Sequence, residues 1–261
     1  MTEKTTTITK KKEKKRRTKI LHYCEECGKW CGSNEECPDC KVKTIVKEVP
    51  LRRNSMYYIK GIDEPLISVT TILKVLAKPQ LIYWAAKTAA ANALADPYMS
   101  EGEAAASIYG KRDSAGNVGS SVHDMIDKGV YGDVDELPTM VREYMRAYEK
   151  WEKQFVKGTI FKEQTVYSEK FRYAGTLDRI IESFDGKKWL VDFKTSKGLY
   201  ADTGLQLSAY RQAVLEMGLL DKIDGIAGVH LKPDGTFSFV EYNDDFDVFM
   251  ALKKVHEWND K

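Results

Sequence analysis

Two strand-forming segments near the middle of the chain constrain the fold more than any other part of the sequence. Residues 173–184 (YAGTLDRIIESF) and 187–196 (KKWLVDFKTS) each mix apolar and polar side chains in strand-like alternation, and only a short turn separates them. This pattern predicts an antiparallel β-hairpin. A period of two residues places Asp192 and Lys194 on the same face of the second strand, while Asp178 lies among apolar residues in the first.

These charged side chains indicate a metal site. A buried carboxylate or ammonium needs a charged partner or a metal ion, because water no longer solvates it. Two carboxylates that come close repel each other unless a divalent cation lies between them, and oxygen ligands favour Mg²⁺ or Mn²⁺. If Asp178 and Asp192 meet, the hairpin is therefore a candidate Mg²⁺ or Mn²⁺ site. The alternative is a ladder of surface salt bridges.

The turn decides whether the two aspartates can meet. A two-residue loop would place Asp178 opposite Phe193, on the wrong face. A three-residue loop over 184–186, with Gly186 in the left-handed conformation, would place Asp178 opposite Asp192. We therefore predict a loop with an odd number of residues, or a bulge, at this turn.

The segments around the hairpin predict an α/β protein. Helical patterns lie on both sides of it, and further strand patterns precede and follow it, which favours a mixed β-sheet layered with helices. Residues 41–60 read as short strands or a strand-like linker. The predicted helices span 68–77, 79–95, 115–128, 138–155, 202–217 and 245–257, and the other predicted strands span 161–169, 225–231 and 236–242.

All five cysteines lie near the start of the chain. Cys24 and Cys27 form one CxxC pair, and Cys37 and Cys40 form a second. Four thiolates at this spacing predict a small zinc knuckle, whose folding energy the Zn²⁺ ion would supply. Two disulfides are the alternative, and the absence of an apolar signal segment disfavours them. Cys31 is read as a free thiol.

The net charge of +2 conceals a basic N-terminal segment. Residues 1–19 contain nine Lys or Arg and two Glu, whereas the remaining 242 residues contain 32 basic and 37 acidic side chains. Such a segment is typical of a disordered arm that contacts a polyanion, and a solvated, solubilising tail is the alternative. No apolar run is long enough for a membrane helix, so we expect a cytoplasmic protein. The candidate contacts are Lys10, Lys11, Lys12, Lys14, Lys15, Arg16 and Arg17.

Four short motifs, in order along the chain, resemble those of a known nuclease superfamily. They are GSSVH at 119–123, GTLD at 175–178, DFK at 192–194 and QLSAY at 206–210. This set resembles the RecB-like branch of the PD-(D/E)XK nuclease superfamily, with its GxxxH and QxxxY motifs. The flanking sequences at 68–87 and 111–127 are similar to bacteriophage exonucleases related to the CRISPR-associated RecB-like nuclease. The resemblance covers about 66–240.

The resemblance implies a restriction-endonuclease-like core over 46–261, after an arm over 1–19 and a zinc knuckle over 20–45. It also implies a metal-dependent DNA exonuclease that leaves 5′-phosphate and 3′-hydroxyl ends. Phage DNA recombination, replication or degradation would be its setting, with a possible recombination partner protein. An endonuclease of the same chemistry and a non-catalytic DNA-binding protein are the alternatives.

The resemblance also assigns roles to single residues. His123, Asp178, Asp192 and the main-chain carbonyl of Phe193 would hold the metal ion, with Glu163 as a possible outer ligand. Lys194 would act on the attacking water and the phosphate. Gln206 and Tyr210, four residues apart on one helix face, would hold this lysine or contact DNA. For Tyr210 ordinary helix packing is the alternative, and for Glu163 a solvent-facing strand position.

The chain departs from several relatives in one respect. Those relatives hold an iron–sulfur cluster with cysteines on both sides of the nuclease core, whereas this chain has no cysteine after Cys40. We therefore do not expect such a cluster here.

Overall fold

The computed structural model of the chain describes residues 19–24, 29–30, 36–37, 41–43, 45–49, 51–53, 55–129 and 132–259. The chain divides into two compact units, Met1–Pro65 and Leu66–Lys261. The sequence predicted the start of the larger domain at residue 46, whereas the division falls after Pro65. Among the described residues, no helix combines the length and the apolar character needed to cross a bilayer.

The first unit contains short strands. β1 (Lys19–Cys24) pairs antiparallel with β2 (Lys29–Trp30) and with β3 (Ile45–Val49), in the order β2-β1-β3. β4 (Leu51–Arg53) and β5 (Met56–Tyr58) form a second antiparallel pair. The strand-like reading of 41–60 is thus confirmed where the structure describes it.

The predicted zinc knuckle and basic arm stay predictions. Cys27, Cys31 and Cys40 lie outside the described residues, as do all seven basic residues proposed to contact a polyanion. Of the other two cysteines, Cys24 ends β1 and Cys37 is buried.

The second unit is built on a mixed sheet flanked by helices, as predicted. Its strands are β6 (Leu66–Ser68), β7 (Val156–Ser168), β8 (Tyr173–Ser183), β9 (Lys188–Lys194), β10 (Gly225–Leu231) and β11 (Phe237–Tyr242). The order is β11-β10-β9-β8, and β8 also pairs with β7 and β6. The β9–β10 and β6–β8 pairs are parallel, and the others are antiparallel.

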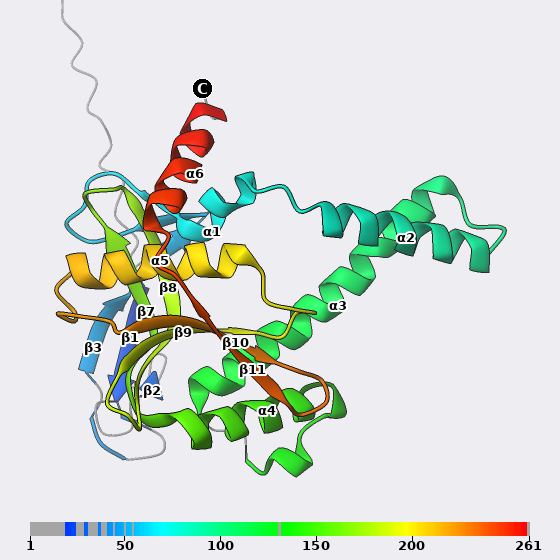
Figure 1. Ribbon diagram of the computed structural model, residues 1–261. Coiled ribbons are helices and arrows are strands. Elements are labelled where there is room, and N and C mark those ends of the chain that lie inside the picture. Colours follow the sequence, from blue (N-terminus) through cyan, green and yellow to red (C-terminus); the bar gives the residue numbers. More distant parts are fainter. Residues whose placement is uncertain are drawn as a thin grey trace, which may run out of the picture. The chain divides into compact units, whose positions relative to one another are not determined.

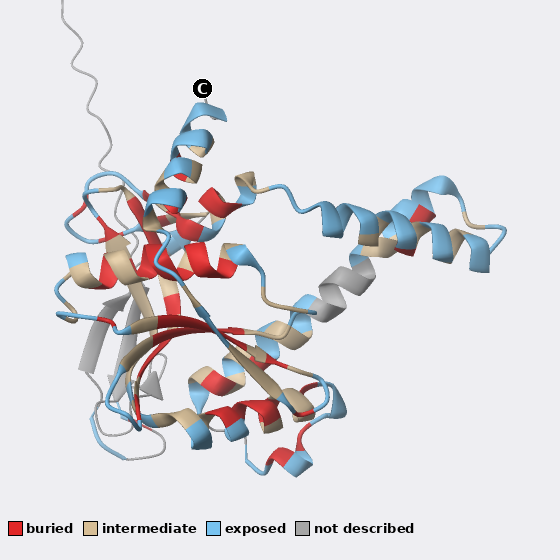
Figure 2. Cartoon of the chain, in the orientation of Figure 1, coloured by how far each residue is buried: buried red, intermediate tan, exposed pale blue. Residues whose placement is uncertain are grey.

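Helices cover both faces of this sheet (Figure 1). α5 (Ala201–Glu216), α1 (Val69–Ile72) and α6 (Phe246–Asn259) pack on one face, around Leu177, Ile180 and Leu190. The end of α3 (Glu101–Lys128) and α4 (Thr139–Phe155) pack on the other, around Ile181, Val191 and Phe193. β8 and β9 are therefore buried on both sides (Figure 2). The remaining helices are α2 (Pro79–Ala95) and the 3₁₀ turns η1 (Leu73–Val75) and η2 (Val134–Glu136).

α3 is much longer than predicted. It spans 28 residues from Glu101, whereas the sequence predicted a start near 115. Ser100 and Glu103 form a capping box at its start, which is a sequence signal for a helix N-terminus. Glycines at 102, 110 and 116 lower the helix propensity of this segment, which is why the sequence pattern did not predict its first half. The first half of α3 packs against α2, and the two extend away from the sheet (Figure 1).

The three-residue loop predicted for the central hairpin is confirmed. The Ser183 N–H donates to the carbonyl of Lys187 at 2.9 Å, and Gly186 has a φ of +79°. The ladder pairs Glu182 with Lys188 and continues to Arg179 opposite Val191, which is the register that the loop requires. The next two residues in this register are Asp178 and Asp192, where the ladder has ended.

A glycine in β8 allows α5 to approach the sheet closely. A Cβ at Gly175 would lie 2.2 Å from Cε1 of Tyr210, so any larger residue displaces the ring. We expect Gly175→Ala to lower the free energy of unfolding by about 1–3 kcal/mol through overpacking. Urea denaturation measures this change. Gly158→Ala in β7 is the control, because its new methyl group would meet open space; equal effects of the two substitutions would contradict the prediction.

Candidate active site

The site lies where β8 parts from its neighbour β9. Their ladder ends at the pair Arg179–Val191. Beyond it, the Phe193 N–H donates to Oδ2 of Asp178 at 2.8 Å, so a side-chain carboxylate takes the place of a backbone carbonyl. We call this point, where the β8–β9 ladder ends, the strand fork. It holds the Asp178 carboxylate at the level of the sheet, where only 15% of the side-chain surface is exposed.

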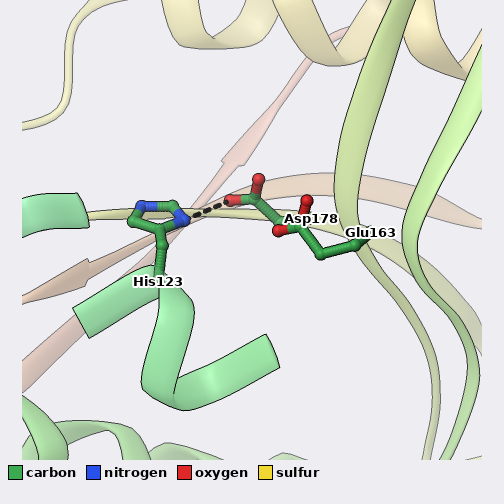
Figure 3. A group of neighbouring side chains, drawn as sticks. All are labelled: His123, Glu163 and Asp178. Atoms are coloured by element: carbon green, nitrogen blue, oxygen red, sulfur yellow. Dashed lines mark ion pairs between the residues drawn. The ribbon is translucent and has the colours of Figure 1, made fainter. Parts of the chain in front are cut away.

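The pairing of β8 with its other neighbour, β7, is also interrupted at Asp178. β7 pairs Lys162 with Arg179 and Gln164 with Leu177, which leaves Glu163 unpaired at the position opposite Asp178. Glu163 has a φ of +45°, a left-handed conformation that costs a non-glycine residue roughly 1–3 kcal/mol. Figure 3 shows the carboxylates of Glu163 and Asp178 close together. Strain of this kind inside a strand is typical of functional sites.

α3 brings a histidine to the same point. His123 Nδ1 lies 3.6 Å from Oδ2 of Asp178 (Figure 3). One turn earlier, a Cβ at Gly119 would lie 3.0 Å from Oγ1 of Thr195, so a glycine here lets the helix approach the loop after β9. This close approach is a physical reason for the glycine in the sequence pattern GxxxH.

His123, Glu163 and Asp178 form a group with the donor atoms of a metal site. One imidazole nitrogen and two carboxylate oxygens lie within 4.8 Å of one another (Figure 3). Carboxylate oxygens suit Mg²⁺, Ca²⁺ and Mn²⁺, and an imidazole nitrogen suits transition metals such as Zn²⁺. The set matches two predicted ligands and the predicted outer ligand.

The carboxyl groups of Asp178 and Glu163 both have raised pKa values. Burial and the neighbouring Asp192 carboxylate raise the pKa of Asp178 to about 6, although His123 and Lys194 oppose the shift. Burial, Asp178 and Asp127 raise the pKa of Glu163 to about 8. Burial is the largest cause of both shifts, and a bound divalent cation would favour the ionised form of each group.

A second set of polar residues lies beside this group. Asp192 is 2% exposed. Its Oδ1 accepts a hydrogen bond, whereas its Oδ2 lies in an ion pair without a hydrogen-bond partner among the described residues. Lys194 Nζ lies 2.5 Å from Oδ2, and Gln206 Nε2 donates to Oδ1 at 2.9 Å. Gln206 Nε2 also lies 3.4 Å from the hydroxyl of Tyr210. Gln206 of the QxxxY pattern thus contacts Asp192, and Tyr210 contacts Gln206. The predicted roles of the pair toward Lys194 or DNA stay predictions.

Lys194 keeps its positive charge in this setting. Burial lowers the pKa of its ammonium group, but the carboxylates of Asp192 and Asp178 outweigh burial, and the pKa lies above its ordinary value. A lysine with a raised pKa retains its proton at neutral pH. It suits the stabilisation of negative charge better than the removal of a proton.

The predicted site residues are therefore brought together in two adjoining sets. His123, Glu163 and Asp178 form the group that could hold a metal ion. Asp192 is not among these three, and Phe193 contributes its N–H to Asp178. These positions do not test the ligand roles that the sequence predicted for Asp192 and for the Phe193 carbonyl.

The sequence analysis missed Asp127 and Arg179. Asp127 lies one helical turn after His123 and helps to raise the pKa of Glu163. Arg179 directly follows Asp178 and is 3% exposed. A charged residue between Asp178 and the apolar Ile180 and Ile181 was the available signal for Arg179, because a buried arginine needs partners.

Comparisons with known proteins leave the chain without a demonstrated family. No family model matches it, and no curated protein matches it. It is similar to the crystal structure of SSO0001, with 21% sequence identity and a TM-score of 0.27. The match covers 42% of this chain and 54% of the other, so the chain spans about half the length of that structure.

We expect the metal-free protein to lose stability as the pH rises. The ordinary pKa values of Asp178 and Glu163 are 3.8 and 4.5, and the folded values are about 6 and about 8. Raised folded values mean that the stabilisation is complete below the unfolded values. It is lost as the pH rises through the folded values.

Glu163→Gln should flatten the part of this loss that lies above about pH 6, because an amide does not ionise. Urea denaturation with a chelator present, at several pH values, measures it. Glu169→Gln, in the exposed turn after β7, is the control. A pH dependence that Glu163→Gln leaves unchanged would show that this carboxyl group is not responsible.

Proposed function

We propose that this chain is a metal-dependent deoxyribonuclease of the RecB-like branch of the PD-(D/E)XK superfamily, with a restriction-endonuclease-like core. The observation that carries the proposal is the strand fork. There His123, Glu163 and Asp178 converge beside Asp192 and a charged lysine. The sequence motifs that resemble the superfamily supply all of these residues except Glu163.

The chemistry of the two sets suits phosphodiester hydrolysis. His123, Glu163 and Asp178 would hold Mg²⁺ or Mn²⁺, which, when bound, supplies Lewis-acid stabilisation and lowers the pKa of water. Lys194 is a fixed positive charge for the phosphate oxygens as negative charge develops on them. Gln206 holds Asp192, so that the Asp192–Lys194 pair keeps its orientation.

DNA as the substrate, and exonuclease rather than endonuclease action, follow from the resemblance to phage exonucleases. The products would be 5′-phosphate and 3′-hydroxyl ends. The basic arm over 1–19 and the zinc knuckle over 20–45 would help to hold DNA, because basic side chains contact phosphates without sequence preference.

The test is a time course of DNA cleavage with Mg²⁺ or Mn²⁺, comparing linear duplex, linear single-stranded and closed circular DNA. We expect linear DNA to be degraded while circles survive. Lys194→Ala should lower the rate by about 10²–10³-fold, the usual cost of one charge-stabilising group. Lys197→Ala removes an exposed lysine three residues further on and is the matched control, expected to cleave like the wild type.

The other outcomes separate the alternatives. Cleavage of circles would retain the chemistry and make the protein an endonuclease. Equal activity of Lys194→Ala and the wild type would remove Lys194 from the mechanism. No cleavage by the wild type with either metal would favour a DNA-binding protein on this fold.

A further inference from the structure

Arg179 is a buried charge beside the site that the proposed chemistry does not use. Its side chain is 4% exposed, and it directly follows Asp178 in β8. Its Nε has no hydrogen-bond partner among the described residues. Burial of a guanidinium costs free energy, and an apolar side chain of similar volume would often cost less. The contacts of the other guanidinium nitrogens show what this group does.

The guanidinium contacts the end of the helix that carries His123. Nη2 of Arg179 donates to the carbonyl of Ile126 at 3.3 Å. Ile126 lies three residues after His123, and α3 ends at Lys128. The last four carbonyls of a helix lack intrahelical donors, and a positive charge at this end is favourable. Arg179 therefore caps α3 from the sheet and fixes its end relative to β8.

The same group contacts α4. Nη1 of Arg179 donates to the hydroxyl of Tyr148 at 2.5 Å and to Oε1 of Glu152 at 2.9 Å. The Tyr148 hydroxyl in turn donates to Glu152. Glu152 is 41% exposed and supplies the negative charge that balances the buried arginine. α4 thus holds the guanidinium in one orientation.

The guanidinium also packs against an aromatic residue of β9. Arg179 Cζ lies 5.8 Å from the centre of the Phe193 ring and 5.4 Å from that of Tyr148. The Phe193 ring in turn meets the His123 imidazole edge-on, with 6.4 Å between ring centres. The backbone N–H of Phe193 is the donor to Asp178. Phe193 therefore contacts Arg179 and both potential ligands.

We propose that Arg179 is a positioning residue that sets the distance between His123 and Asp178, and thereby the affinity of the site for a divalent cation. The proposal rests on the metal site of the proposed function. Three elements that meet at the guanidinium each affect the site. α3 carries His123, β8 carries Asp178, and β9 carries Phe193. The planar guanidinium can donate hydrogen bonds in several directions and stack on aromatic rings, so it can contact all three elements at once. A lysine ammonium group cannot stack on a ring or donate in this fixed geometry.

The test measures Mn²⁺ affinity by isothermal titration of the full-length protein. Binding to Asp178→Asn is subtracted, so that only the ion at this site is counted. We expect Arg179→Lys, which keeps the charge, to raise the Mn²⁺ dissociation constant by about 10- to 100-fold, the usual cost of losing a group that orients metal ligands. Arg179→Met should weaken binding at least as much. If that variant does not fold, Arg179→Lys decides.

Met145→Ala separates positioning from stability. Met145 is fully buried in the same core on α4, whereas the hydrogen bonds of the guanidinium go to Tyr148, Glu152 and Ile126. Its truncation should lower the melting temperature while Mn²⁺ affinity stays at the wild-type value. A folded Arg179→Lys protein that binds Mn²⁺ as tightly as the wild type would overturn the proposal. So would equal losses of affinity in Met145→Ala and Arg179→Lys.

The wild type distinguishes this inference from the proposed function. If the wild type and Asp178→Asn bind Mn²⁺ equally, the metal site itself is absent, and both proposals fail. If the wild type binds through Asp178 and cleaves DNA while Arg179→Lys does both equally well, only the role of Arg179 fails.

Discussion

The interruption of strand pairing on both sides of β8 at Asp178 is the constraint on which the rest of the site depends. The backbone N–H and C=O groups of paired strands form hydrogen bonds with one another. Where the pairing is interrupted, these groups need other hydrogen-bond partners. Here the Asp178 carboxylate accepts the Phe193 N–H, and Glu163 leaves the ladder with a positive φ. Two carboxylates thereby meet at one level of the sheet, beside the imidazole of His123.

Helices on both faces then supply the remaining groups. α3 brings His123 to the carboxylates, and α5 brings Gln206 to Asp192. The balance of charge differs between the two sets. Asp192 has a lysine partner, whereas burial and neighbouring carboxylates raise the pKa values of Asp178 and Glu163. Carboxyl groups held against ionisation make the group of His123, Glu163 and Asp178 the candidate place for a cation. This group is the physical link between the fold and the proposed nuclease chemistry.

Much of the fold could be predicted because its signals are local. Proline at 79 starts α2, and Gly186 at a left-handed position fixes the hairpin register. The first half of α3 was missed because its glycines weaken the helical pattern, although the capping box at Ser100 marked the start. In the site, Asp178, Asp192 and Lys194 could be found because charge inside an apolar strand is conspicuous. Arg179 has the same signal, but its partners lie on α3 and α4, far away in sequence.

The sequence by itself determined which residues carry charge in apolar strands, which residues share a strand face, and which loop length sets the hairpin register. These follow from side-chain alternation and turn chemistry, which act between near neighbours. Only the tertiary structure decided that Glu163 joins His123 and Asp178 while Asp192 pairs with Lys194. It also decided that Gln206 holds the aspartate and that Arg179 ties α3 to the fork. The reason is that the interruption of pairing at Asp178 and the packing of three helices against it depend on contacts between distant segments. No local pattern encodes the distances between such segments.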